Sequence, residues 1–349
     1  MKMRPAVRAY LSRALLFVGT SCVLAAGLEG ALAMKARFID ARSPIALGLS
    51  ADIPPMWAKR VVSIAGADHA YYWHGHLEVF DENGMRRSSP FPARTRGLGR
   101  VVVVGDSLTY GQGVEASDAY PEVLERRLRA AGYNVEVLNL GRKGYQSEDV
   151  ARTVRDFVPS LHPDLIVYGI CLNDFLESGQ KIYHDNERWP FPLPDRWKEF
   201  LIDRTRLGRL ASRAYDGILM AAGIRGDFVS DILRNFNDRQ TRFARDLKSM
   251  NDAAAARGTP PIVAMVLDQQ PVHNGRLERL AKIAQSAANS AGMTVIDTSS
   301  YYERYSGHTM KVSPWEGHPN EEAHRIWAGM FFDRLVENAA LARFHRKSR

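Results

Sequence analysis

The sequence predicts an α/β protein in which a parallel sheet is covered by helices on both faces. Two observations predict this class. From Arg100 onward, short apolar runs alternate with segments of helical periodicity. The apolar runs, such as VVVVG at 101–105, are continuous and do not alternate with polar residues, as expected for strands buried on both faces. The 349 residues suffice for one large domain with additions.

Each element of this alternation has its own signal. Ser147 is a candidate helix cap, and Gly132, Gly258 and Gly292 stand where three helical patterns end. The runs expected to be strands are 101–105, 135–140, 164–171, 260–268 and 293–297. The segments expected to be helices are 120–132, 147–161, 236–258, 276–292 and 321–340.

Two segments do not follow the alternation. Residues 34–98 are irregular and contain the aromatic run HAYYWHGHLEVF, followed by the turn signal DENG at 81–84. They predict a hairpin or small appendage before the main domain, which we expect over 99–345. Residues 175–235 carry WPFPLPDRW and then an arginine-rich helical stretch, and they read as an insertion. It forms either a wall at the strand ends, where ligands of such sheets bind, or a surface decoration.

Composition excludes several functional classes. The net charge of +8 is spread along the chain and mixed with acids, without a zinc-finger or RNA-recognition pattern, so we expect no nucleic-acid partner. Two cysteines, Cys22 and Cys171, support neither a disulfide framework nor a zinc cluster. His69, His74 and His76 lack an acidic or thiolate companion, so a structural or surface role is favoured over a metal site.

The N-terminus has the pattern of an export signal. Residues 1–13 are basic, residues 14–28 are apolar, and Ala31-Leu32-Ala33 supplies a small-x-small ending. Cleavage after Ala33 and retention of 14–33 as a membrane anchor are both open, and the alternative is a buried helix of a soluble protein. The basic flank should stay cytoplasmic, so the rest of the chain should cross the membrane.

Polar groups stand at the ends of the expected strands. The first strand leads to Ser107, the second to Asn139 and on to Gly144, and the third to Asn173. His318 lies just before the last helix. Because the carboxyl ends of parallel strands share one edge of a sheet, we expect these groups to converge although they are far apart in sequence.

This set of groups suits acyl transfer from an ester. Ser107 is the candidate nucleophile and His318 the base that takes its proton. A carboxylate should orient the imidazole and stabilise its charged form. The oxyanion donors are expected to be the N–H groups of Ser107 and Gly144 and the amide of Asn173, and losing one such donor typically costs ~2.7–4 kcal/mol.

The same residues resemble the SGNH hydrolases, the GDSL esterase and lipase superfamily. GDSLTYG at 105–111 is similar to the first block of that family, NLGRKG at 139–144 to the second, LND at 172–174 to the third and GHPN at 317–320 to the fifth. The resemblance spans about residues 100–340 and implies a flavodoxin-like three-layer α/β/α fold. FDENGMRR before the first strand is similar to the lead-in of exported bacterial members.

Two positions depart from the family pattern. Cys171 stands where the third block usually has glycine, and its small side chain should still allow the loop. Glu316 stands where the fifth block usually has aspartate before the histidine. Glu316 is therefore the expected orienting acid, Asp297 is the alternative, and some members of the family use a serine–histidine pair alone.

The resemblance implies an exported serine esterase that needs no metal or organic cofactor. The expected substrates are short-chain or acetyl esters, including those on envelope carbohydrate, and the expected location is periplasmic or secreted, or anchored in the membrane. An O-acyltransferase would use the same residues, and a binding protein with an inactive site is the remaining alternative. Aromatic side chains either stack on sugar rings or belong to the core: Tyr110, Trp189, Phe191 and Trp197.

Overall fold

The structure is a computed structural model with two compact units. Residues 59–186 and 227–349 form one unit, and residues 1–58 and 187–226 form the other. The residues that it describes are 5–38, 60–61, 69–73, 76–80, 85–86, 91–178, 194, 197, 205–222, 224, 228–267, 275–298, 310–313 and 316–345.

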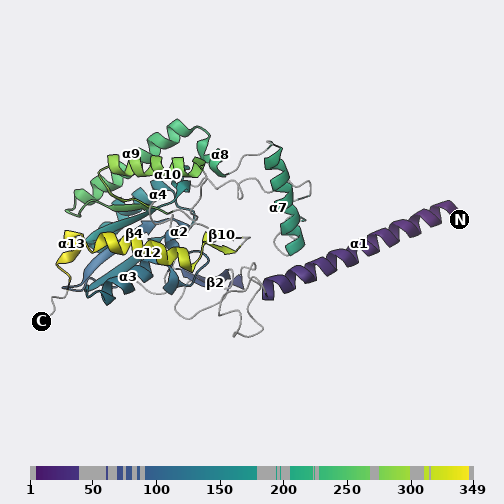
Figure 1. The fold of residues 1–349 in the computed structure, drawn as a ribbon, viewed down its shortest axis with the longest axis horizontal. Coiled ribbons are helices and arrows are strands. Elements are labelled where there is room, and N and C mark those ends of the chain that lie inside the picture. The colour runs from purple at the N-terminus through teal and green to yellow at the C-terminus, as the bar shows by residue number, and fades with distance from the viewer. Residues whose placement is uncertain are drawn as a thin grey trace. The chain divides into compact units, whose positions relative to one another are not determined.

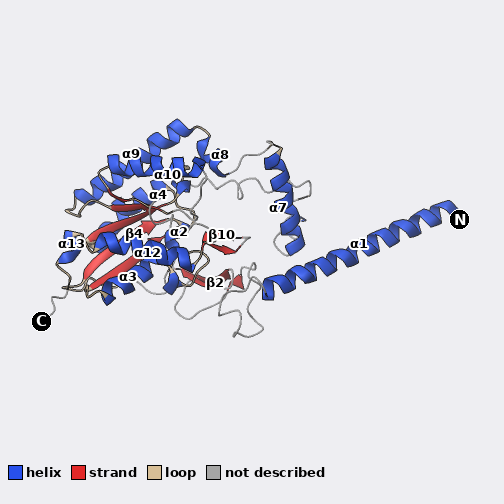
Figure 2. Ribbon diagram, viewed as in Figure 1, coloured by secondary structure: helices blue, strands red, loops and turns tan. Residues whose placement is uncertain are grey.

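A five-stranded parallel sheet forms the centre of the larger unit, in the order β5-β4-β6-β7-β8 (Figure 2). Its strands are β4 (Gly99–Gly105), β5 (Val135–Gly141), β6 (Leu165–Ile170), β7 (Val263–Val266) and β8 (Thr294–Ile296). The first three are buried along their whole length, because helices cover both faces. These strands lie within or close to the runs that the sequence predicts.

Alternate residues of β4 supply the two halves of the core. Val101 and Val103 pack on the side of α3 and α12, whereas Val102 and Val104 pack on the side of α4, α9 and α10 (Figure 1). The helices are α3 (Tyr120–Ala130), α12 (Glu321–Leu335), α4 (Ser147–Arg152), α9 (Phe236–Ala255) and α10 (Gly275–Ser290). The predicted three-layer α/β/α fold is confirmed.

One predicted helix is shorter than expected. The α-helical part of 147–161 ends at Arg152, and a π turn (Thr153–Phe157) and a 3₁₀ turn (Val158–Leu161) complete the segment. The Thr153 hydroxyl donates to the Asp149 carbonyl at 2.9 Å, and Pro159 has no N–H to continue an α-helical ladder. Other short elements are α2 (Ser107–Tyr110), 3₁₀ turns at Ala116–Asp118 and Leu172–Phe175, α8 (Phe228–Leu233), α13 (Ala339–Ala342), β9 (Lys311–Ser313) and β10 (Glu316–Pro319).

The segment before the sheet contains a small antiparallel sheet. β2 (His69–Trp73) pairs with β3 (His76–Phe80), and β1 (Arg60–Val61) adds to β2. The predicted hairpin therefore lies within 69–80, and the turn signal at 81–84 and His74 lie outside the described residues. Within the described part of the chain, no group of three or more His, Cys, Asp or Glu side chains could hold a metal ion.

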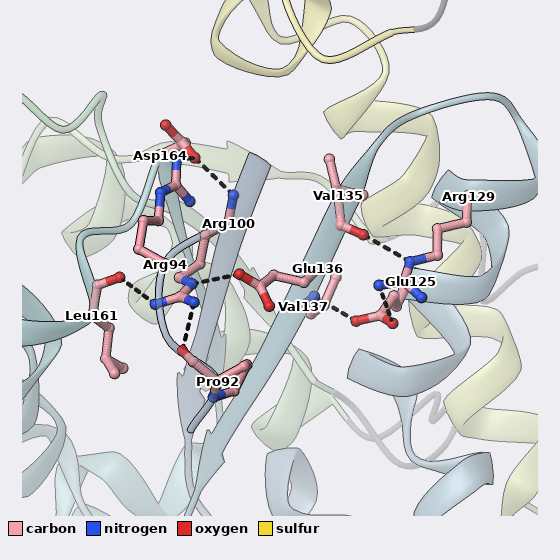
Figure 3. A network of polar contacts seen from close by, with 10 residues as sticks. All are labelled: Pro92, Arg94, Arg100, Glu125, Arg129, Val135, Glu136, Val137, Leu161 and Asp164. Carbon is pink, nitrogen blue, oxygen red and sulfur yellow. Dashed lines mark hydrogen bonds and ion pairs between the residues drawn. The ribbon is translucent and has the colours of Figure 1, made fainter. Parts of the chain in front are cut away.

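The amino ends of β4 and β5 are closed by a network of charges (Figure 3). Arg100 is 2% exposed and donates to the Glu136 carboxylate at 2.7 Å and to the carbonyls of Leu161 and Pro92, both at 2.8 Å. Its backbone N–H donates to Asp164 at 2.7 Å. The network ties both strands and the turn before β6 together at the end of the sheet opposite Ser107.

The described residues of the smaller unit include two long helices. α1 (Pro5–Phe38) includes a stretch long and apolar enough to cross a membrane, Leu16–Met34, and none of that stretch is buried. α7 (Arg206–Ala221) lies in the predicted insertion and forms the expected arginine-rich helix. The predicted domain boundaries at 33, 98 and 345 stay predictions.

Candidate active site

Ser107 stands where β4 turns sharply into α2. Asp106 caps α2, because its carboxylate accepts a hydrogen bond from the Leu108 N–H at 2.8 Å. Gly105 allows the turn, since a Cβ there would lie 2.1 Å from Thr109 Oγ1 and 2.8 Å from the Gly169 carbonyl. The first N–H groups of a helix have no intrahelical acceptor, so the Ser107 N–H is available for an oxyanion.

His318 reaches Ser107 from a distant part of the chain. β10 pairs with β9 with a shift of register between Glu316 and Pro319, so one extra residue is accommodated beside His318. Such bulges commonly re-aim a side chain next to an active site. Asn320 then caps α12, accepting from the Ala323 N–H at 3.2 Å. The imidazole Nε2 lies 3.0 Å from Ser107 Oγ across 211 positions of sequence.

The two other expected oxyanion residues follow the neighbouring strands. Gly144 lies in the loop after β5, with a φ of +78° and open space around its Cα. Asn173 lies in the 3₁₀ turn after β6 and is 4% exposed. Asn173 and the Cys171 thiol lie close enough to Asp106 to oppose the rise of its pKa on burial. The turn therefore forms with Cys171 in place of the usual glycine.

The orienting acid stays a prediction. The backbone of Glu316 belongs to β10, but its side chain lies outside the described part of the structure. Asp297 directly follows β8 at the carboxyl edge of the sheet and is exposed.

Two carboxyl groups are buried beneath the serine, Asp106 and Asp174, each 1% exposed. Burial raises the pKa of both, and the charge of Asp106 raises that of Asp174 further. The hydrogen bond from the Leu108 N–H opposes the rise of the Asp106 pKa. Hydrogen bonds from the Tyr168 hydroxyl at 2.6 Å and from the Cys171 N–H at 2.9 Å oppose the rise of the Asp174 pKa.

Sequence reasoning did not find a contact between β3 and the glycine loop. Glu78 is fully buried on β3, pairs with the Lys143 ammonium group and accepts from the Gly113 N–H at 3.2 Å. Lys143 directly precedes Gly144. Because Glu78 lies in the irregular segment before the sheet, its pattern alone gave no signal of this role.

The aromatic residues expected either to stack on sugars or to belong to the core differ in their exposure. Tyr110 is core, at 1% exposure, with the cations of Arg86 and Lys143 over its ring at 5.4 and 4.7 Å. Trp197 is 50% exposed, whereas Trp189 and Phe191 lie outside the described residues.

The fold and this site together define a class of protein. A serine and a histidine in hydrogen-bond contact at the carboxyl edge of a doubly covered parallel sheet are typical of an acyl-transferring hydrolase. The model of the GDSL-like lipase/acylhydrolase family matches residues 103–326. The chain belongs to this family.

Three solved structures that are similar to the chain have low sequence identity to it. TesA is 16% identical, with a TM-score of 0.44, covering 68% of this chain and 98% of that one. A lipase/acylhydrolase from Enterococcus faecalis is 14% identical, with a TM-score of 0.43 and coverage of 72% and 100%. An acetylxylan esterase from Geobacillus stearothermophilus is 15% identical, with a TM-score of 0.42 and coverage of 72% and 97%. The comparison with curated proteins gives no match.

Proposed function

We propose that this acylhydrolase is an exported serine esterase that hydrolyses short-chain or acetyl esters, including those on envelope carbohydrate. The observation that carries the proposal is the 3.0 Å contact between Ser107 Oγ and His318 Nε2. A serine hydroxyl is a weak nucleophile until a base within this distance takes its proton.

In the first half of the reaction, Ser107 Oγ attacks the acyl carbon while its proton passes to His318 Nε2. The negative charge on the acyl oxygen is stabilised by the N–H groups of Ser107 and Gly144 and by the Asn173 amide. The C–O bond to the alcohol then breaks, and the alcohol leaves with the proton that His318 holds. The product is an acyl-serine.

In the second half, a water molecule attacks the acyl-serine and gives its proton to His318. The same donors stabilise the second oxyanion, and the Ser107–acyl bond breaks. His318 returns the proton to Ser107, and the carboxylic acid is released. The steps require no group beyond the chain, the ester and water.

The buried carboxyl group of Asp106 helps to hold Ser107 in position. Asp106 holds the start of α2 by accepting a hydrogen bond from the Leu108 N–H at 2.8 Å.

Export rests on the N-terminal segment. The apolar stretch of α1 suits a signal sequence or an anchor, and the basic residues before it favour a cytoplasmic start. An extracytoplasmic esterase meets esters of the envelope, which is the reason for proposing acylated carbohydrate and other short acyl esters as substrates.

The test uses the full-length chain in mild detergent with a fluorogenic acetyl ester and a serine-reactive phosphonate. We expect turnover and phosphonate labelling, both lost in Ser107→Ala. Absence of turnover and of labelling in the parent chain would contradict the proposal and favour a binding protein. Acyl transfer to a sugar alcohol in preference to water would instead identify an O-acyltransferase.

A further inference from the structure

A glutamate interrupts the apolar part of α1 and is bonded to a distant helix. Glu29 lies inside the stretch Leu16–Met34. Its carboxylate accepts from the backbone N–H groups of Arg206 at 2.9 Å and Leu207 at 2.7 Å, and from the Arg206 guanidinium at 3.2 Å. These residues begin α7. Glu29 therefore supplies the acceptor and the negative charge that the start of a helix lacks.

α1 contacts α7, and the partly covered side chains of the apolar stretch lie on one face of α1. In the stretch 16–34, the described side chains that are partly covered are Ala25, Glu29, Leu32 and Ala33. Their spacing of four, three and one residues places them on one side of a helix. Two of the four are alanines, and small side chains allow helices to approach closely, as they do in membranes.

The remaining faces of this stretch are apolar and open. Phe17 is 73% exposed, Val23 72% and Leu24 69%. Nineteen residues of helix measure about 28 Å, close to the ~30 Å hydrocarbon thickness of a bilayer. Lipid therefore provides the apolar surroundings that these side chains lack in water.

α7 also presents an open apolar stripe. Ile218 is 65% exposed, and it follows exposed alanines at intervals of four and three residues. The members of the stripe are Ala211, Ala214, Ile218 and Ala221. The sequence of α7 contains Arg206, Arg209 and Arg213 against Asp216. A basic helix with an apolar stripe suits the surface of a bilayer that contains anionic lipid.

We propose that α1 and α7 form one membrane-binding unit. α1 is retained as a spanning anchor, and α7 lies in the outer headgroup region of a bilayer with anionic phospholipid. Glu29 is five residues before Met34, so it lies about 7.5 Å inside the end of the apolar stretch. That depth falls within the ~5–10 Å to which interfacial helices sink. An ionisable residue at such a depth needs a partner, and α7 provides it.

Retention of α1 is tested on the full-length chain expressed in a Gram-negative host. We expect the protein to stay in the membrane fraction after alkaline carbonate washing, with an intact mass that includes residues 1–33. Cleavage after Ala33 would remove Glu29, so a mature chain that begins at Met34 would overturn the proposal. The measurement does not depend on esterase activity, so the two proposals fail separately.

The position of α7 is tested with an environment-sensitive fluorophore on Ile218→Cys in a Cys22→Ser background. The labelled full-length chain is reconstituted in vesicles of phosphatidylethanolamine and phosphatidylglycerol, and the parent without Ile218→Cys corrects for labelling of Cys171. We expect a blue shift of emission and stronger quenching by a nitroxide-labelled lipid than by aqueous iodide. Emission at an aqueous wavelength with iodide as the stronger quencher would overturn the placement of α7.

Glu29 variants separate the helix pairing from simple insertion. Glu29→Leu makes α1 more apolar, so anchoring should persist while quenching of the Ile218→Cys label by lipid falls. Glu29→Gln keeps an acceptor oxygen and is the matched control, with most of the quenching retained. Equal quenching in the parent and in Glu29→Leu would contradict the pairing.

Discussion

Arg100 near the start of β4 and Asp106 just after its end are both almost fully buried, and the charges around them are arranged differently. At the amino end, the Arg100 guanidinium pairs with the Glu136 carboxylate at 2.7 Å and the Arg94 guanidinium pairs with Asp164 at 2.6 Å, so each acid there has a cation as its partner (Figure 3). At the carboxyl end, Asp106 and Asp174 are buried close enough for the charge of Asp106 to raise the pKa of Asp174.

The difference separates charges that hold the fold from charges that serve the site. Opposite charges that satisfy each other close one end of the sheet, where they fasten β4, β5 and the start of β6. Two acidic groups buried side by side resist ionisation of both, and such arrangements concentrate at functional sites. We therefore expect substitutions at the carboxyl end to change activity more than stability, and the reverse at the amino end.

The largest effect is expected at the carboxyl end from Ser107→Ala and His318→Ala. Each should lower kcat by roughly 10⁴-fold or more, because nucleophile and base act as a unit. The double variant should be no less active than either single variant. Steady-state kinetics on a short-chain ester measures all three, and additive losses in the double variant would contradict a shared step.

At the amino end, Arg100→Met should destabilise the fold by about 3–5 kcal/mol while leaving kcat unchanged in the folded protein. The substitution leaves the Glu136 carboxylate buried without its cation. Arg100→Met/Glu136→Leu, which removes both charges, should recover much of the loss. Urea unfolding measures the stabilities. A large fall in the kcat of the folded Arg100→Met variant would contradict the separation between the two ends of the sheet.

Asn173→Ala should lower kcat by roughly 10²–10³-fold, since it removes an oxyanion donor worth ~2.7–4 kcal/mol. KM should change little, because the donor acts mainly in the transition state. Cys171→Gly, two residues earlier and matching the family pattern, is the control and should keep activity. If Asn173 had only a structural role, Asn173→Ala would instead raise KM and lower the thermal stability of the protein.

Glu122 tests the effect of burial near β5, where the Asn139 amide donates to it at 3.3 Å. Burial raises the pKa of Glu122 from its ordinary 4.5 to about 7. The folded state therefore binds more protons between pH 4.5 and 7, and its stability falls as pH rises through that window. Glu122→Gln should match the parent at about pH 4 and exceed its stability by at most about 3 kcal/mol at about pH 8. Urea unfolding at both pH values measures this difference. A stability difference between variant and parent that is the same at both would contradict the linkage.

The smallest effect is expected from Glu78→Gln, through the loop that carries Gly144. Replacing the partner of Lys143 weakens a charge-assisted hydrogen bond, so kcat should fall by up to about tenfold at nearly constant KM. Lys143→Met should give a similar loss, and the double variant should lose less than the sum of the two. Unchanged phosphonate labelling rates in all three would show that Glu78 does not position the loop.

The sheet was predictable because its signals are local. The valines of β4 and the apolar runs of the other strands are continuous, and three of the five predicted helices end at a glycine stop signal. The miss within 147–161 has a local cause as well, since Thr153 bonds back to the Asp149 carbonyl. The Glu78 contact was not predictable, because one acidic residue in an irregular segment gives no periodic signal.

The sequence by itself determined which segments form the strands and helices of the alternation, because these patterns depend on residues that lie within a few positions of one another. Only the tertiary structure decided that the imidazole of His318 lies 3.0 Å from Ser107 Oγ. That distance depends on a bulge in β10, on the packing of α12 and on contacts across 211 positions of sequence. It also decided that the pKa of Asp174 is raised, since burial and the neighbouring Asp106 act on this carboxyl group only in the folded chain.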